Sequence, residues 1–274
     1  MARKTRFIAF ALLAAVSFVF ASCKKDNTLM YGNLTMGNFV GDKFISDQGN
    51  EFTIVENTTG QDFIGIKRAI MQCDVLNKTE GVENGYDVRV IYLSEVLTKA
   101  PVTLEDAESD PEKMIDDPIR VDHAWIAGGY LNLYVMFEIQ YSPKLEESKH
   151  MVNLLYSPSE IGSGKYTLTL RHNAYGETLA GKETEEGGKL EDQTQIQSTD
   201  MIQWGLTGGY VSFQLSDIIT ESEAELSINW VEHATDAQNN WLTEVISKSG
   251  TLTYNKTNFE QVPLKLTTKT APLK

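Results

Sequence analysis

The chain of 274 residues carries 38 acidic and 24 basic side chains, which leave a formal net charge of −14 at pH 7. So acidic a protein repels the phosphates of nucleic acids and anionic lipid headgroups, and no basic stripe offsets that repulsion. Nucleic acid is therefore excluded as a partner. The length is enough for one large or two modest domains.

The first 22 residues have the pattern of a bacterial export signal. A positive head precedes an apolar stretch over 7–20, which is shorter than the roughly 20 residues of a membrane-spanning helix. Residues 20–23, Phe-Ala-Ser-Cys, resemble the bacterial lipobox, in which a diacylglycerol alkylates the cysteine thiol before cleavage. We expect a lipoprotein signal peptide over 1–22, a lipid anchor on Cys23 and a tether over 23–31. An ordinary secretory signal is the alternative.

A lipid on Cys23 would make the bilayer a partner and place the protein in the cell envelope. Loss of the three basic residues of the signal takes the net charge from −14 to about −17. No Asp directly follows the cysteine, which favours the outer membrane and leaves its periplasmic face and the cell surface as alternatives. Cys73 would then have no partner for an intrachain disulfide, and its strand-like setting predicts a small buried residue.

Residues 32–100 are predicted to form a small all-β domain of four to six strands. Runs of about 12 residues are long for an open sheet and suit a small barrel, in which strands coil and bend. Strand patterns separated by turn signals cover 39–46, 51–56, 63–76 and 86–97.

The character of the chain changes over 101–118, where prolines punctuate an acidic stretch. This composition predicts an interdomain linker or a solvated loop. A Ca²⁺ site is the alternative, although the spacing of the acids lacks that of an EF-hand loop.

Residues 119–274 are predicted to form an antiparallel β-sandwich. Apolar and polar residues alternate over 130–139, which indicates a strand with one buried face. Shorter alternating runs separated by turn signals follow as far as residue 254, as in sandwich domains. A Trp followed by Gly-Gly and Tyr occurs at 125–130 and again at 204–210, which predicts two analogous corners of the sandwich.

Catalytic chemistry has no signature in the sequence. None of the four histidines has the spacing of a zinc site or of a nucleophile motif. Asp122 precedes His123, and Glu232 precedes His233, but neighbours in a strand point to opposite faces, so neither pair is expected to form a dyad. We therefore predict no catalytic, cofactor-binding or metal site, and structural or surface roles for His123, His150, His172 and His233.

Exposed aromatic side chains are the remaining candidates for ligand contacts, because their rings can stack on sugars. Most tryptophans and tyrosines of a sandwich belong to its core or rim, so each has a structural role as the alternative. The candidates are Trp125, Tyr130, Tyr134, Tyr141 and Trp241.

The order of these parts resembles the NigD-like lipoproteins of Bacteroidota. The residues that carry the resemblance are Cys23, 44–49 through Val55, 86–90 through 97–99, 117–119 leading to 125–131, and 170–173. The resemblance implies an OB-like domain over 32–100 and a C-terminal β-sandwich after the linker. It implies no catalytic residues, and an immunity role in that family rests on operon association.

These observations favour a membrane-anchored envelope lipoprotein that is not an enzyme and binds a protein or a glycan. A bacteriocin immunity factor is one alternative. An undetected glycoside hydrolase is the other, and it would require two carboxyl groups about 5 to 10 Å apart in a cleft.

Overall fold

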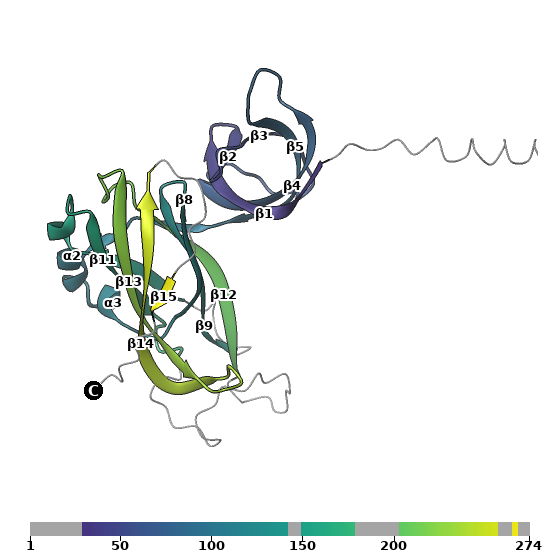
Figure 1. The fold of residues 1–274 in the computed structure, drawn as a ribbon. Helices are drawn as coiled ribbons and strands as arrows, with labels where there is room; N and C mark the ends of the chain where they lie inside the picture. Colours follow the sequence, from purple (N-terminus) through teal and green to yellow (C-terminus); the bar gives the residue numbers. More distant parts are fainter. Residues whose placement is uncertain (1–28, 142–148, 179–202, 257–264, 268–274) are drawn as a thin grey trace, which may run out of the picture.

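A small barrel stands against a larger two-sheet sandwich in this computed structural model (Figure 1). The structure describes residues 29–141, 149–178, 203–256 and 265–267. The all-β architecture predicted from the sequence, a barrel followed by a sandwich, is confirmed. No helix within these ranges has the length and apolar character needed to cross a bilayer.

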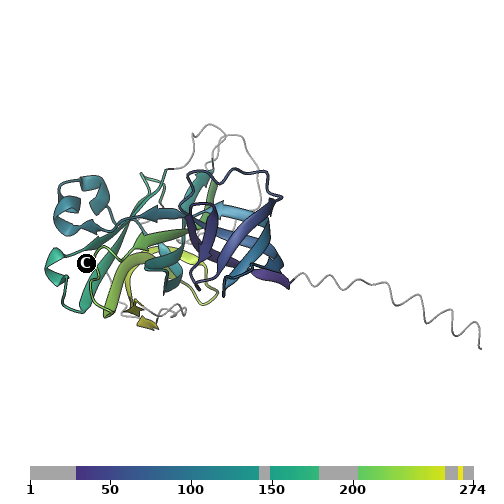
Figure 2. The same ribbon diagram turned by 90° about the horizontal axis from the view of Figure 1, so that it is seen from above.

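The barrel closes in the strand order β1-β2-β3-β5-β4 and encloses its own apolar core. Strands β3 and β5 are parallel, and the other neighbours are antiparallel. The view from above in Figure 2 shows the strands wound obliquely. Cys73 lies in the core, 1% exposed, as predicted. The strands are β1 (Leu29–Val40), β2 (Lys43–Ser46), β3 (Glu51–Asn57), β4 (Arg68–Lys78) and β5 (Gly85–Glu95).

The sandwich packs a six-stranded sheet on a four-stranded sheet. The first has the order β15 (Lys265–Thr267), β14 (Trp241–Asn255), β13 (Glu223–Thr235), β11 (Lys165–Asn173), β10 (Met151–Tyr156), β7 (Val102–Thr103). The second has the order β6 (Leu97–Lys99), β12 (Gln203–Gln214), β9 (Tyr130–Tyr141), β8 (Arg120–Ala127). Most pairs are antiparallel, but β7–β10, β6–β12 and β11–β13 are parallel.

One apolar core fills the space between the two sheets. Leu131, Leu133 and Val135 of β9 point inward from the four-stranded sheet, as the alternation over 130–139 predicts. Leu168 and Leu170 of β11 meet them from the other sheet. Burial of each apolar side chain of this size contributes about 1.5–3 kcal/mol to the stability of the fold, so the apolar side of each strand faces the core. The opposite face of each sheet therefore remains available for contacts outside the core.

Residues 101–118 are not the linker that their composition predicts. They supply β7, the short helices α2 (Leu104–Glu108) and α3 (Pro111–Met114), and a segment joined to the six-stranded sheet. The Thr103 hydroxyl and the Asp110 carboxylate cap the two helices, and Ala107 is fully buried. The chain passes from barrel to sandwich at Val96 instead, because β6 already pairs with β12.

The repeated Trp and Gly-Gly pattern does not mark two analogous corners. Gly128 and Gly129 form the turn between β8 and β9, with φ of 60° and 83°. Gly208 and Gly209 lie inside β12 and pair with Met136 and Val135 of β9. The first two glycines are needed for the positive φ angles of the turn, whereas Gly208 leaves room for the Tyr134 ring.

Candidate functional site

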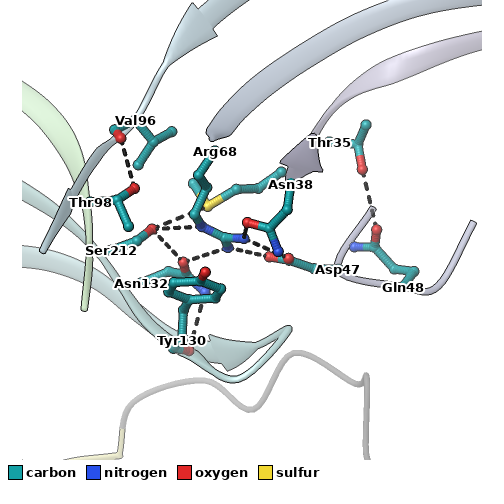
Figure 3. Close-up of polar contacts among 11 residues, drawn as sticks. Thr35, Asn38, Asp47, Gln48, Arg68, Val96, Thr98, Tyr130, Asn132 and Ser212 are labelled. Carbon is teal, nitrogen blue, oxygen red and sulfur yellow. Dashed lines mark hydrogen bonds and ion pairs between the residues drawn. The ribbon is translucent and has the colours of Figure 1, made fainter. Parts of the chain in front are cut away.

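A buried arginine joins the two domains (Figure 3). Arg68 begins β4 of the barrel, and its side chain has no exposed surface. Its two terminal nitrogens meet the Asp47 carboxylate at 2.9 Å and 2.6 Å, and Nη1 also donates to Asn38 Oδ1 at 3.0 Å. Asp47 directly follows β2, in the turn that leads to β3. The barrel thus holds one half of the guanidinium.

The sandwich holds the other half. Arg68 Nε donates to Ser212 Oγ at 3.0 Å, and Nη2 donates to Asn132 Oδ1 at 2.8 Å. The guanidinium carbon lies 4.2 Å from the centre of the Tyr130 ring. All five N–H groups of the arginine therefore have an acceptor, which is the full capacity of the side chain. We call this group the Arg68 clasp: Asn38, Asp47, Arg68, Tyr130, Asn132 and Ser212.

We expect the clasp to provide orientation more than stability. Burial raises the pKa of the Asp47 carboxyl, and the hydrogen bonds and positive charge of Arg68 act against that shift. A buried ion pair of this kind often contributes little net stability, because desolvation offsets the attraction, yet the loss of one partner costs much. A Cβ on Gly128 would lie 2.5 Å from Asp47 Oδ1, so the β8–β9 turn needs glycine to reach the clasp.

A small apolar cluster lies beside the clasp. Met36 of β1, Ile70 of β4 and Val96 are buried together, and Trp125 of β8 packs on them from the sandwich. Polar and apolar contacts thus fix the barrel on the outer face of the four-stranded sheet.

The same sheet face continues past the barrel as a surface rich in aromatic rings. Tyr134 lies two residues after Asn132 on β9, and Tyr210 two residues before Ser212 on β12, so both share the face of the clasp. The Tyr134 and Tyr210 rings lie 4.8 Å apart, and the Trp125 ring meets Tyr210 edge-on at 6.1 Å. We call this surface the aromatic shelf: His123, Trp125, Tyr134 and Tyr210.

The aromatic shelf is partly exposed to solvent, with Tyr210 and His123 as its exposed side chains. Tyr210 is 37% exposed, and the exposed His123 ring lies 6.5 Å from that of Tyr134. Gly208 makes room for Tyr134, whose hydroxyl would lie 2.7 Å from a Cβ at that position. The buried Trp125 Nε1 has no hydrogen-bond acceptor among the residues that the structure describes. The shelf thus offers ring faces with polar groups at their edges.

The five predicted aromatic candidates separate into three groups. Trp125 and Tyr134 belong to the shelf, where Tyr210 joins them without having been predicted. Tyr130 belongs to the clasp, and Trp241 is 4% exposed and stacks on His233, so neither is free to bind a ligand. The Tyr141 side chain lies outside the part of the molecule that the structure describes.

Of the four histidines, His172 and His233 are buried and His123 is exposed. His233 Nε2 lies 2.9 Å from Oε1 of the buried Glu138, whereas the neighbouring Glu232 accepts a hydrogen bond from Trp230. The prediction that neighbouring acid and histidine residues do not interact is wrong for Asp122 and His123, because Asp122 Oδ2 lies 2.9 Å from His123 Nδ1. A bulge after Val121 breaks the alternation on which that prediction rested.

His150 and His172 form a linked pair at the end of the sandwich core. His172 Nδ1 donates to the Pro118 carbonyl oxygen at 3.1 Å, so its Nε2 must accept from His150 Nδ1 at 2.9 Å when both rings are neutral. Burial lowers the pKa of His172 to about 4, with a further contribution from His150. Burial also lowers the pKa of His150, while Glu177, 3.7 Å away, acts against that shift.

No group of three or more His, Cys, Asp or Glu side chains in the described ranges is arranged to hold a metal ion. Cys23, the predicted site of lipidation, lies outside the described residues, together with the predicted signal peptide.

Comparisons with known proteins concern both domains. Residues 101–186 match the family model of the NigD-like C-terminal beta sandwich domain. The match begins at the segment that supplies β7, α2 and α3, which agrees with the place of that segment in the sandwich. No curated protein matches the chain in sequence.

Several solved structures share the fold. A NigD-like immunity protein from Bacteroides caccae has a TM-score of 0.52 at 16% identity, over 77% of this chain and 89% of its own. A candidate toxin-related protein from Parabacteroides distasonis has 0.53 at 20%, over 82% and 92%. A candidate lipoprotein from Bacteroides fragilis has 0.50 at 13%, over 82% and 97%. At these identities, the likeness shows a shared fold and nothing beyond it.

Proposed function

We propose, from the premise that residues 101–186 form a NigD-like C-terminal β-sandwich domain in a chain with the NigD-like fold, that this protein is a glycan-binding lipoprotein of the cell envelope. Cys23 carries the lipid, and the outer membrane is the proposed location. The aromatic shelf is the proposed binding surface, and it is the observation that carries the proposal.

The chemistry of the shelf fits a sugar chain. Ring faces stack on the apolar C–H faces of sugars, while the Tyr hydroxyls and the His123 imidazole are placed to exchange hydrogen bonds with sugar hydroxyls. The rings of Tyr134 and Tyr210 come from adjacent strands, at positions that pair directly, so a rigid sheet holds their spacing. Trp125 extends the surface to the edge of the barrel.

The clasp supports this role because it fixes the barrel beside the shelf. A ligand on the shelf would therefore contact a preorganised surface, which lowers the entropy lost on binding. We also propose an OB-like character for the barrel, which its five strands and their order support. Some barrels of that kind bind oligosaccharides, but a fold by itself does not establish a function.

We propose binding without turnover. A glycoside hydrolase would need a pair of carboxyl groups flanking the sugar. The carboxylate of Asp122 lies beside the shelf, where it contacts His123 and Arg120, but it is a single carboxylate and not a pair. An immunity factor remains the alternative function, and the fold shared with an immunity protein does not favour it at 16% identity. Deletion of the gene would separate the two, because only an immunity role predicts new sensitivity to a toxin made by the same cells.

Replacement of Tyr210 by Ala should weaken glycan binding at least about tenfold, because truncation of a central aromatic contact typically costs about 2 kcal/mol or more. Envelope polysaccharide coated on a plate measures the binding. Tyr92→Ala is the matched control, since Tyr92 is 47% exposed on the barrel strand β5. Equal binding by the two variants, or no binding above an unrelated acidic lipoprotein, would refute the proposal.

The two cysteines should behave differently toward fatty acid and thiol reagents. Burial raises the pKa of Cys73 to about 11, so the native thiol should react at least about 100-fold more slowly than the unfolded one. After unfolding, one reactive thiol per chain is expected if Cys23 is acylated, and two if it is not. Fatty-acid labelling should disappear in Cys23→Ser and persist in Cys73→Ala. A wild-type chain without label would contradict the anchor.

A further inference from the structure

A concave site lies on the outer face of the six-stranded sheet, where the parallel strands β11 and β13 separate. Their pairing ends at Thr169 and Asn229, and Ile119 then enters between them, its N–H donating to Val231 O at 2.9 Å. The pocket at this fork has a volume of about 390 Å³, within the range of small-ligand sites. We call it the fork pocket; its walls include Asp116, Thr169, Arg171, Asn229, Val231 and Ser247.

Four neutral polar residues line the fork pocket: Thr169, Asn229, Ser247 and Ser249. Leu168, Leu170 and Ile228 point into the core, so Thr169 and Asn229 point outward by alternation. Ser247 of β14 pairs with Val231 and continues that outer face. The Thr169 hydroxyl, the Asn229 amide and the Ser247 hydroxyl have no side-chain hydrogen bond to any residue in the described ranges. These groups are thus available to a ligand.

The charges of the fork pocket cancel. Arg171 Nη1 forms an ion pair with Asp116 Oδ2, and the two side chains are 23% and 34% exposed. An anion in the pocket would meet Asp116, and a cation would meet Arg171. Lys248 also lines the pocket, but alternation directs its side chain to the other face, where it pairs with Glu232 at 3.3 Å. The site therefore favours a neutral ligand.

We propose that the fork pocket binds one neutral sugar unit. A sugar hydroxyl both donates and accepts hydrogen bonds, which suits a lining that mixes hydroxyls, an amide, guanidinium donors and carboxylate acceptors. The apolar part of the lining comes from Trp230 and Val231, which are 3% and 5% exposed. The inference goes beyond the proposed function, because the fork pocket and the aromatic shelf lie on the outer faces of different sheets.

Ligand-observed saturation-transfer NMR with the full chain would test this site, with methyl glycosides of glucose, galactose, mannose and N-acetylglucosamine as neutral probes. Glucuronate and glucosamine serve as probes with a negative and a positive charge. At least one neutral probe should bind saturably, with a Kd of about 1 mM, and at least about tenfold more tightly than both charged probes. No saturable binding by any neutral probe, or equal binding by a charged one, would overturn the proposal.

Two variants locate the binding. Ser247→Leu should fill the fork pocket and lower the affinity at least about tenfold, and the milder Asn229→Ala should lower it severalfold. Tyr210→Ala should leave it unchanged, so failure of the shelf proposal and failure of this one are distinguishable. Unaltered affinity in both pocket variants, with thermal unfolding confirming that each is folded, would refute the assignment.

Discussion

Replacement of Arg68 by Ala should destabilise the protein by about 3–5 kcal/mol, measured as the free energy of unfolding in urea. The substitution leaves the Asp47 carboxylate, 2% exposed, without its cation, and it removes the donors that Asn38, Asn132 and Ser212 accept from. The barrel and the sandwich would also lose their main polar contact. Separate unfolding transitions for the two domains are therefore expected.

Two comparisons isolate the buried charge as the cause. Arg89→Ala removes ion pairs with Glu56 and Asp74 from a partly exposed arginine and should cost no more than about 1 kcal/mol. The double variant Arg68→Met with Asp47→Leu should be more stable than Arg68→Ala, because no unpaired charge remains in the interface. Should the double variant be the least stable of all, the ion pair itself would be the source of stability and our account would be wrong.

Acidification from pH 6.5 toward pH 4 should lower the stability by up to about 3 kcal/mol through His172. Its pKa is about 4 in the folded chain and near 6.5 in an unfolded one, so the unfolded state takes up a proton that the folded state refuses over this range. The contribution is therefore complete above pH 6.5 and is lost as the pH falls. Urea unfolding at a series of pH values measures it.

The variant His172→Gln removes the larger of two contributions, because burial also lowers the pKa of His150. It should therefore reduce the dependence on pH between 6.5 and 4, although it also lowers the stability at pH 7. His123→Gln is the matched control, because the His123 side chain is 71% exposed and should leave the slope unchanged. Burial raises the pKa values of Asp47 and Asp116, so these two groups increase the stability as the pH falls. Their contribution is the same in the wild type and in both variants and therefore cancels when the slopes are compared. Equal slopes in the wild type and His172→Gln would contradict the assignment.

Local periodicity explains which parts of the fold were predictable. The alternation over 130–139 places Leu131 and Leu133 in the core, because a strand with one buried face must alternate. The segment 101–118 was misjudged because its acids and prolines are typical of solvated chain. Its structure depends on tertiary contacts, such as the hydrogen bond from Asp117 N to His172 O.

The Arg68 clasp could not be predicted in the same way. Arg68 lies 21 residues from Asp47 and 144 from Ser212, and no local pattern records such distant partners. A weak signal existed, since Arg68 directly precedes the apolar Ala69, Ile70 and Met71, where a charged residue needs a buried counterion. Tyr210 was missed because the pattern Trp and Gly-Gly favoured a turn, whereas Gly208 serves the packing of Tyr134 inside a strand.

The pairing of β6 with β12 has a consequence for how the chain reaches its native state. Leu97 of the edge strand β6 pairs with Val211 of β12, which lies more than a hundred residues later in the chain, so the four-stranded sheet cannot be completed until both are synthesised. Closure of such large loops slows folding, and chains dominated by remote pairings are among the slowest folders of their size. Synthesis of the first half alone cannot complete either sheet of the sandwich. We expect the newly made polypeptide to stay unfolded for long enough to be compatible with the export that we propose.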